Sequence, residues 1–375
     1  MKVAIALFPM LPLAAVLLVA SPVGAPLEIG AGERLLVIAP HPDDETLGAG
    51  GLVQRVLARG GSARVVILTA GDGYPDAVAR ETGNREPRPA DFVAYGRRRM
   101  GEARAAVREL GGGRVHLQFL GFPDGGLAPL LHAHWRRSHP ERSATTGASD
   151  PPYPEVVEPN VAYDGDDLLR EIAEILRDTA PTVIALPDPA DAHPDHSATG
   201  LFALLALEAQ SRAPASHGPP LPRIFLYLVH WRAWPEGFTS PTPPGPDTPL
   251  ELPEGLPEPG LPRVALLLSD FERGAKAAAL ARHGSQQEIM GSFLRAFVRR
   301  TEPFRVLATP ALDQIAIAVE RSLGLAQALH RAAEAPRADD VGALGASSRR
   351  DLPAPPGRPQ SRLLGARGAD SPVLQ

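Results

Sequence analysis

PHPDDETLGAGG, residues 40–51, follows directly on the apolar run RLLVIA at Arg34–Ala39. A short apolar run that stops at a proline is typical of a buried parallel strand. A helix-length segment, Glu45–Arg59, comes next, and RVVILT at Arg64–Thr69 predicts a second buried strand. This strand–helix–strand order indicates a βαβ unit, in which both strands run in the same direction.

The same alternation continues along the body of the chain. Apolar runs predict further strands at Val115–Leu120, Thr182–Leu186, Arg223–Val229 and Arg263–Leu268. Apolar residues at helical spacing predict helices at Phe92–Leu110, Asp166–Asp178, Ala198–Gln210, Asp270–His283, Gln286–Arg299 and Pro310–Ala333. We therefore expect an α/β fold, Rossmann-like, whose mostly parallel sheet carries helices on both faces in a three-layer sandwich.

The two ends of the chain differ from this body. No charged residue occurs from Val3 to Leu27, and Lys2 precedes that run, so residues 1–27 are predicted to be a signal peptide or a membrane anchor. The implied location is exported or N-terminally anchored, with membrane association through this segment. Residues 30–335 are expected to form the globular domain. Residues 336–375 are poor in aromatic and β-branched residues and are predicted to be a disordered tail.

Two long insertions interrupt the alternation, near residues 130–163 and 234–262. Long loops in α/β domains are often functional. The second insertion is rich in proline, however, and such a segment can be a stiff surface excursion.

Composition excludes several classes of function. The 375 residues include no cysteine, which excludes disulfides, thiolate metal sites and a cysteine nucleophile. A formal charge of −5 gives no electrostatic reason to expect nucleic-acid binding. No G-x-S-x-G motif of a serine hydrolase occurs. The glycine-rich residues 48–51 fall inside a predicted helix, which disfavours a nucleotide-binding Rossmann site.

Histidines and carboxylates gather after two of the predicted strands. Parallel sheets bind ligands at the carboxyl ends of their strands, and imidazole and carboxylate are the ligands that zinc takes when thiolate is absent. One histidine and one aspartate of the first cluster, with one histidine of the second, would make a catalytic zinc site. A remaining carboxylate would then serve as general base, and a remaining histidine would stabilise an oxyanion or protonate a leaving amine. The candidate residues are His41, Asp43, Asp44, His193, Asp195 and His196. In the alternative interpretation, the aspartates only cap the helices that follow.

PHPDDETLGAGG after a buried strand, with HPDH at residues 193–196, resembles the PIG-L/LmbE family of zinc-dependent N-deacetylases. The resemblance covers about Leu35–Arg305 apart from the two insertions. Members of this family remove acetyl from N-acetylglucosaminyl-inositol, N-acetylglucosaminyl-malate and related sugars. The resemblance implies a hydrolase that uses metal-activated water to remove acetyl from an N-acetylated amino sugar, in a small molecule or a glycan. The implied cofactor is Zn²⁺, with Fe²⁺ or Co²⁺ as alternatives at a nitrogen–oxygen site.

Matched position by position, the family pattern makes His41, Asp44 and His196 the metal ligands. Asp43 matches the general base that takes a proton from the attacking water.

Other positions match residues with auxiliary roles. His193 matches the residue that, in its protonated form, stabilises the oxyanion and helps the amine to leave, and Asp195 matches the residue that orients it. Arg99 matches a substrate-contacting arginine and Asp124 a polar contact near the sugar. Alternatively, Arg99 is a solvated helix residue and Asp124 only shapes a turn. The sequence departs from the pattern at Asp191, where some sugar deacetylases of the family have a tyrosine.

Two other functions stay open at this point. One is a zinc amidase that acts on another N-acyl group, in a lipid or a peptide-like amide. The other is a non-catalytic carbohydrate-binding relative. The segment KAAALARHGSQ, residues 276–286, also looks like part of the family pattern, but no role is assigned to it, and the oligomeric state is left open.

Overall fold

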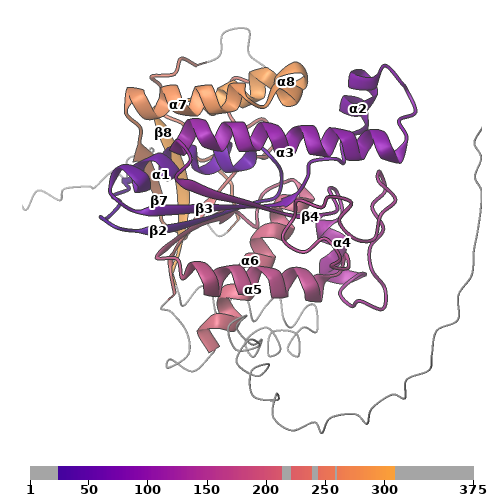
Figure 1. Ribbon diagram of the computed structural model, residues 1–375. Helices are drawn as coiled ribbons and strands as arrows, with labels where there is room; N and C mark the ends of the chain where they lie inside the picture. Colours follow the sequence, from indigo (N-terminus) through magenta and orange to yellow (C-terminus); the bar gives the residue numbers. More distant parts are fainter. Residues whose placement is uncertain (1–23, 213–220, 239–243, 258–259, 309–375) are drawn as a thin grey trace, which may run out of the picture. The chain divides into compact units, whose positions relative to one another are not determined.

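The computed structural model describes residues 24–212, 221–238, 244–257 and 260–308. Within these residues a single eight-stranded sheet has the order β1-β7-β8-β6-β5-β2-β3-β4 (Figure 1). The strands are β1 Ala25–Pro26, β2 Arg34–Ala39, β3 Ser62–Thr69, β4 Val115–Phe122, β5 Val183–Pro187, β6 Arg223–Tyr227, β7 Arg263–Leu267 and β8 Thr301–Leu307. The helices are α1 Asp44–Ala58, α2 Pro75–Thr82, α3 Pro89–Gly111, α4 Leu127–His132, α5 Gly165–Thr179, α6 Pro194–Arg212, α7 Asp270–Ala281 and α8 Gly284–Ala296.

Most strand pairs are parallel, and β8 alone runs antiparallel to its neighbours β6 and β7. From β2 the chain moves outward through β3 to β4, and it then returns to β5 on the other side of β2. The carboxyl ends of β2 and β5 therefore flank a topological switch point, which is where sheets of this kind bind ligands.

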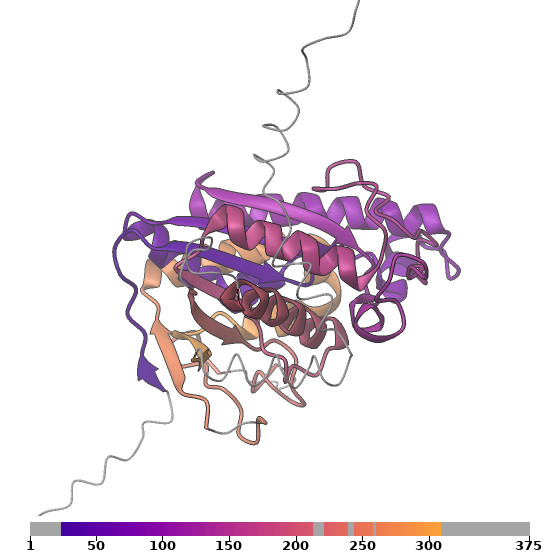
Figure 2. The same ribbon diagram turned by 90° about the horizontal axis from the view of Figure 1, so that it is seen from below.

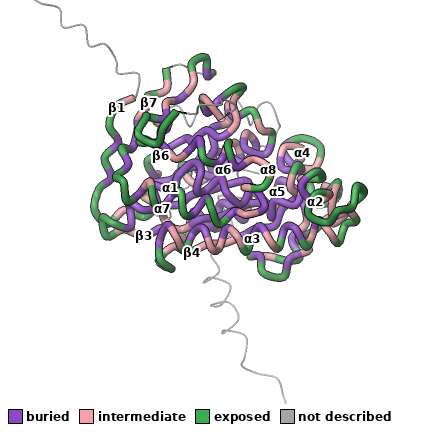
Figure 3. The backbone as a smooth tube through the Cα atoms, turned by 90° about the horizontal axis from the view of Figure 1, so that it is seen from above, coloured by how far each residue is buried: buried purple, intermediate pink, exposed green. Residues whose placement is uncertain are grey.

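Helices cover both faces of the sheet, so the fold has three layers (Figures 1 and 2). Helices α1, α3 and α7 pack together on one face, and α4, α5 and α6 pack on the other. Strand β2 shows why: Leu35 and Val37 belong to the core on one face, and Leu36 and Ile38 belong to the core on the other. Figure 3 shows the resulting buried interior, with exposed backbone concentrated in loops and at α2.

The structure confirms the expected α/β class with a mostly parallel sheet and helices on both faces. Strand β2 has the predicted bounds, and the other predicted elements among the described residues recur with small changes at their ends. Strand β8 was not predicted, because it contains Pro303, and proline removes a hydrogen-bond donor from the ladder. The predicted helix Pro310–Ala333 and the predicted tail 336–375 lie outside the described residues.

Both insertions contribute to the hydrophobic core. In the first, Tyr153 and Tyr163 are buried, and the hydroxyl of Tyr163 donates to the carbonyl of Gly121 at 2.9 Å. In the second, Leu250 and Leu252 are buried against the same core as α1. Over its described part the proline-rich insertion is therefore anchored to the core at these residues, whereas residues 244–249 are exposed, as expected of a surface excursion.

The last residues of the predicted leader belong to the sheet. Ala25 pairs with Val264 of β7, and the side chain of Leu27 is buried. The folded domain thus begins before residue 27, and residues 1–23 lie outside the described part. Among the described residues, no helix combines the length and the hydropathy needed to cross a membrane.

Candidate metal centre

The loop after β2 holds Asp43 in an unusual backbone conformation, with φ 121°. Residues other than glycine rarely adopt positive φ, and such strain is typical of functional sites. The carbonyl of Asp43 accepts hydrogen bonds from the N–H groups of Thr46 (3.0 Å) and Leu47 (2.9 Å), so Asp43 is the N-cap residue of α1. Its carboxylate makes no capping hydrogen bond, however. The capping alternative therefore fails for this side chain, whose carboxylate instead contacts the guanidinium of Arg99.

Three predicted ligands meet at the switch point. Oδ2 of Asp44 lies 3.1 Å from Nδ1 of His41 and 3.1 Å from Nε2 of His196. Ligand atoms bonded to a tetrahedral zinc at about 2.0–2.1 Å lie about 3.4 Å from one another. All three side chains are almost fully buried. Neither ring nitrogen of His196 makes a hydrogen bond of acceptable geometry among the described residues, which leaves Nε2 available to a metal. The donor types and the two separations through Asp44 suit a divalent cation, and His41, His193 and His196 also place one ring nitrogen each within 4.8 Å of one another.

The electrostatics of these groups favour a cation at this position. Burial opposes charge on His41, but the carboxylates of Asp124, Asp195 and Asp44 together raise the pKa of His41 well above its usual value. Burial likewise opposes charge on His196, yet the carboxylates of Asp44 and Asp191 together outweigh it and raise the pKa of His196 to about 9. The two histidines in turn hold the pKa of Asp44 well below its usual range, against the effect of burial. A bound metal ion would balance the negative charge of these carboxylates, which protons on His41 and His196 otherwise balance.

Two further carboxylates orient His41 from its other ring nitrogen. Nε2 of His41 lies 3.2 Å from Oδ2 of Asp195 and 3.2 Å from Oδ1 of Asp124. Backbone N–H groups fix both carboxylates: Gly125 donates to Asp195 at 2.7 Å, and Gly73 donates to Asp124 at 2.6 Å. Carboxylates behind a ligating histidine fix its tautomer and its ring orientation. The structure thus places Asp124 beside the predicted metal ligands.

Asp195 contacts its expected partner His193 differently from the sequence-based prediction. The backbone N–H of Asp195 donates to Nδ1 of His193 at 3.2 Å, whereas its carboxylate faces His41. His193 is therefore oriented by the first turn of α6, which begins at Pro194 and not at the predicted Ala198.

His193 itself lies next to the metal ligands, with its ring centroid 4.9 Å from that of His41 and 5.0 Å from that of His196. Burial and these two rings lower the pKa of His193 to about 4. The lowered pKa favours the neutral ring, whereas the sequence-based prediction gave His193 a protonated form during the reaction. Because Nδ1 accepts the N–H of Asp195, the proton of the neutral ring belongs on Nε2.

Arg99 is buried beneath the strained loop. Its guanidinium donates to the carbonyls of Gly71 (2.9 Å) and Pro42 (2.7 Å) and to Oδ2 of Asp43 (3.3 Å). Arg99 is thus not a solvated helix residue. Its guanidinium contacts the carboxylate of Asp43 and the backbone next to it. Burial raises the pKa of Asp43 to about 7, although the charge of Arg99 opposes this rise. A carboxylate with a pKa near the working pH is suited to act as a general base.

Asp191, the departure from the family pattern, orients His196. Its Oδ2 lies 3.4 Å from Nδ1 of His196 and accepts the N–H groups of Val229 (2.9 Å) and His230 (3.0 Å). Its Oδ1 accepts the N–H of His193 at 2.9 Å. A carboxylate in this position ties both histidines of the second cluster to the end of β6.

His230 is not among the site residues predicted from the sequence, yet it lies beside them. Its ring centroid lies 4.8 Å from that of His196 and 5.3 Å from that of His193, and Phe293 stacks on it at 5.4 Å. Nitrogens of His230 and His196 and an oxygen of Asp44 lie within 4.8 Å of one another. Ligand sites lie at the carboxyl ends of parallel strands, and the predicted strand Arg223–Val229 ends immediately before His230. His230 could therefore have been predicted from its position.

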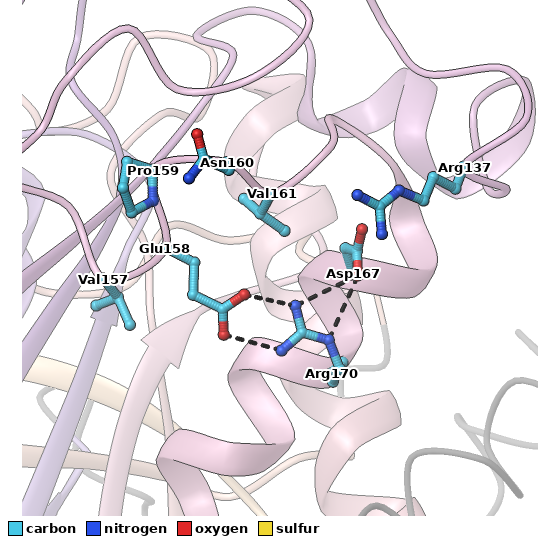
Figure 4. Close-up of a pocket in the computed structure, with 8 residues that line it drawn as sticks. All are labelled: Arg137, Val157, Glu158, Pro159, Asn160, Val161, Asp167 and Arg170. Atoms are coloured by element: carbon cyan, nitrogen blue, oxygen red, sulfur yellow. Dashed lines mark hydrogen bonds and ion pairs between the residues drawn. The ribbon is translucent and has the colours of Figure 1, made fainter. Parts of the chain in front are cut away.

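A separate polar hollow of about 300 Å³ lies between the first insertion and α5 (Figure 4). Within it, Arg170 donates to the two carboxylate oxygens of Glu158 at 2.9 and 3.0 Å and also contacts Asp167. Its lining residues are Arg137, Val157, Glu158, Pro159, Asn160, Val161, Asp167 and Arg170. None of them belongs to the metal centre, and the ion pairs of Arg170 satisfy most of its charge, so we assign the chemistry to the cluster at the switch point.

The chain is similar to known deacetylases. The family model PIG-L, described as GlcNAc-PI de-N-acetylase, matches residues 36–207. The 1D-myo-inositol 2-acetamido-2-deoxy-alpha-D-glucopyranoside deacetylase of Rhodococcus jostii (strain RHA1) is 30% identical, and the match covers 69% of this chain and 83% of that relative. The corresponding deacetylase 1 of Saccharopolyspora erythraea is also 30% identical, over 69% of this chain and 80% of the relative. Among solved structures, N,N'-diacetylchitobiose deacetylase from Pyrococcus horikoshii is 19% identical with a TM-score of 0.45, covering 74% of this chain and 84% of that one.

Proposed function

The chain belongs to the PIG-L family of de-N-acetylases, and from this premise we propose that it is a metal-dependent hydrolase that removes acetyl from an N-acetylated amino sugar. The proposed cation is zinc, held by His41, Asp44 and His196. The substrate class comes from the relatives, which are named as deacetylases of an N-acetylglucosamine–inositol conjugate.

One observation carries the proposal. The ligand atoms of His41 and His196 each lie 3.1 Å from the same oxygen of Asp44, and the carboxylate of Asp43, next to them in sequence, makes no capping bond. A site that combines three ligands with an adjacent carboxylate that does not cap a helix can bind a cation and move a proton at the same place. When bound there, a divalent cation supplies Lewis acidity toward a carbonyl oxygen and toward water.

The residues of the chain supply the proton transfers of amide hydrolysis. Asp43 takes a proton from water while the water oxygen bonds to the acetyl carbon. This attack places negative charge on the former carbonyl oxygen. The C–N bond then breaks, and the proton held by Asp43 passes to the departing amine. The products are acetate and a free amino sugar, and Asp43 returns to its starting state.

His193 stabilises the charge on the oxygen. As a neutral ring with its proton on Nε2, it can donate a hydrogen bond without itself losing a proton. The His193→Gln variant keeps a donor near the position of Nε2 and should retain more activity than His193→Ala.

The proposal is tested by acetate release from N-acetylglucosaminyl-inositol and from N-acetylglucosamine oligomers. The protein is stripped of metal with a chelator and then reconstituted with zinc, iron or cobalt. We expect acetate release to return with one molar equivalent of metal per chain. Reconstituted protein that releases no acetate from any of these substrates contradicts the proposal.

The alternative is a zinc amidase that acts on another N-acyl group. The residues described at the site would act on the amide group, and none of them is assigned a contact that would distinguish acetyl from a longer acyl chain. The same reconstituted protein, offered N-fatty-acyl glucosamine and N-acetyl peptides, distinguishes the two. Release of fatty acid at a higher kcat/KM than acetate would favour the alternative.

A further inference from the structure

The segment 276–286 brings one histidine to the buried side of the metal centre. His283 lies between α7 and α8, and its carbonyl accepts the N–H groups of Gln286 (3.0 Å) and Gln287 (2.9 Å) at the start of α8. Its side chain is fully buried, and neither ring nitrogen makes a hydrogen bond of acceptable geometry among the described residues. A buried imidazole without such a bond calls for a functional explanation.

The ring of His283 faces a carboxylate that holds the proposed general base. Nε2 of His283 lies 3.5 Å from Oε1 of Glu45, which is fully buried. Oε2 of the same carboxylate accepts the backbone N–H of Asp43 at 2.9 Å, and Oε1 accepts the hydroxyl of Thr46 at 2.7 Å. Burial opposes charge on the ring, yet Glu45 and Asp43 outweigh it and raise the pKa of His283. A line of contacts therefore runs from His283 through Glu45 to Asp43.

Asp43 needs this support because of its backbone conformation. A non-glycine residue at φ 121° persists only where its surroundings hold it. Arg99 holds the loop from one side, through the carbonyl of Pro42 and the carboxylate of Asp43. Glu45 holds the backbone N–H of Asp43, the group that Arg99 does not reach.

The other polar members of the segment make contacts elsewhere. Lys276 donates to the carbonyl of Leu47 in α1 at 2.9 Å. Ser285 donates to Glu102 of α3 through its N–H (2.9 Å) and its hydroxyl (2.6 Å). Of these three side chains, His283 is the one that reaches the loop of Asp43.

We propose that Glu45 and His283 are positioning residues for the general base: Glu45 fixes the backbone of Asp43 in its strained conformation, and His283 fixes the carboxylate of Glu45. The inference rests on the proposed function, since the position of Asp43 affects a rate only if Asp43 moves a proton. Misplacing a catalytic group by about 1 Å can cost on the order of 100-fold in rate.

The test compares His283→Leu, which removes the ring nitrogens, with His283→Gln, which keeps a donor near the position of Nε2. We expect His283→Leu to lower kcat by about 10- to 100-fold, with KM and the metal bound per chain unchanged. His283→Gln should recover most of that loss. Ser285→Ala is the matched control in the same segment, and it should keep the wild-type kcat even if it melts at a lower temperature.

Crystal structures of Glu45→Ala and wild type, each with metal bound, give a readout that needs no substrate. We expect Asp43 to leave positive φ in Glu45→Ala while the metal ligands keep their places. The proposal is overturned if Asp43 keeps its conformation there, if His283→Leu keeps the wild-type kcat, or if its loss of kcat matches a loss of bound metal. Failure of wild-type protein to release acetate would instead reject the proposed function, and the two crystal structures would still decide the positioning role.

Discussion

Replacing Glu171 by glutamine should stabilise the protein near neutral pH. Glu171 lies on α5, its side chain is 2% exposed, and neither carboxylate oxygen has a hydrogen-bond partner among the described residues. Burial, aided by the charge of Glu158, raises the pKa of Glu171 from its ordinary 4.5 to about 9. The folded protein therefore keeps a proton on this carboxyl group over a pH range in which the unfolded chain loses it.

The sign and size of the effect follow from proton linkage. Between about pH 4.5 and 9 the folded state binds more protons than the unfolded state, so the contribution of Glu171 to stability falls as the pH rises. The slope is about 1.4 kcal/mol per pH unit, and pH 7 lies about 2.5 units above the unfolded pKa. Glutamine has the same shape and does not ionise. Glu171→Gln should therefore be more stable than wild type by about 3 kcal/mol at pH 7 and nearly equal to it at pH 4.5.

Urea denaturation of wild type and variant at several pH values between 4.5 and 8, with metal present throughout, measures this difference. Glu174→Gln, one turn further along α5 and partly exposed, is the control and should change the unfolding free energy by less than about 1 kcal/mol at each pH. A Glu171→Gln difference that stays constant across this range would refute the reasoning, because it would mean that Glu171 is ionised in the folded protein.

Three further predictions concern packing, a buried ion pair and the support of a metal ligand. Gly48→Ala should destabilise the protein by about 1–3 kcal/mol in urea, because the new Cβ would lie 2.3 Å from a tyrosine ring of β6; Gly50→Ala in the same helix meets atoms no nearer than 3.5 Å and should not destabilise it. Lys276→Met should cost about 3–5 kcal/mol, since it leaves the buried carboxylate of Glu302 without its 2.7 Å cationic partner; the double variant with Glu302→Gln should recover part of that loss. Asp191→Asn should weaken zinc affinity by about 10- to 100-fold in a chelator competition titration, and it should also lower the melting temperature of the metal-free protein, because an amide cannot accept at both oxygens where Asp191 accepts backbone N–H groups.

The fold was predictable where strands are buried on both faces. RLLVIA is apolar throughout because residues of both faces pack against helices, and β2 accordingly has the predicted bounds. Strand β8 was not predictable from local pattern, because Pro303 argues against a strand. In the structure Pro303 pairs with Ala265 of β7, and flanking residues of β8 make the tertiary pairs that hold it in the sheet.

The composition of the site was predictable, but its internal contacts were not. Strand-end positions identify His41 and His196 because the topology brings the ends of β2 and β5 together. The contacts of each side chain depend on the local backbone conformation, which the spacing of residues along the sequence does not determine. Arg99 lies under the loop of Asp43, where it donates to the carbonyl of Pro42. Asp195 lies in the first turn of α6, which starts four residues earlier than predicted, and its carboxylate faces His41.

The central claim is that Asp43 moves the proton of a reaction carried out at a metal held by other residues. Its most direct test is acetate release by Asp43→Asn, measured together with metal content; asparagine is chosen because it tolerates positive φ. We expect a wild-type metal content and a kcat lowered by about 10²- to 10⁴-fold. A variant that keeps both its metal and a near-wild-type kcat would contradict it.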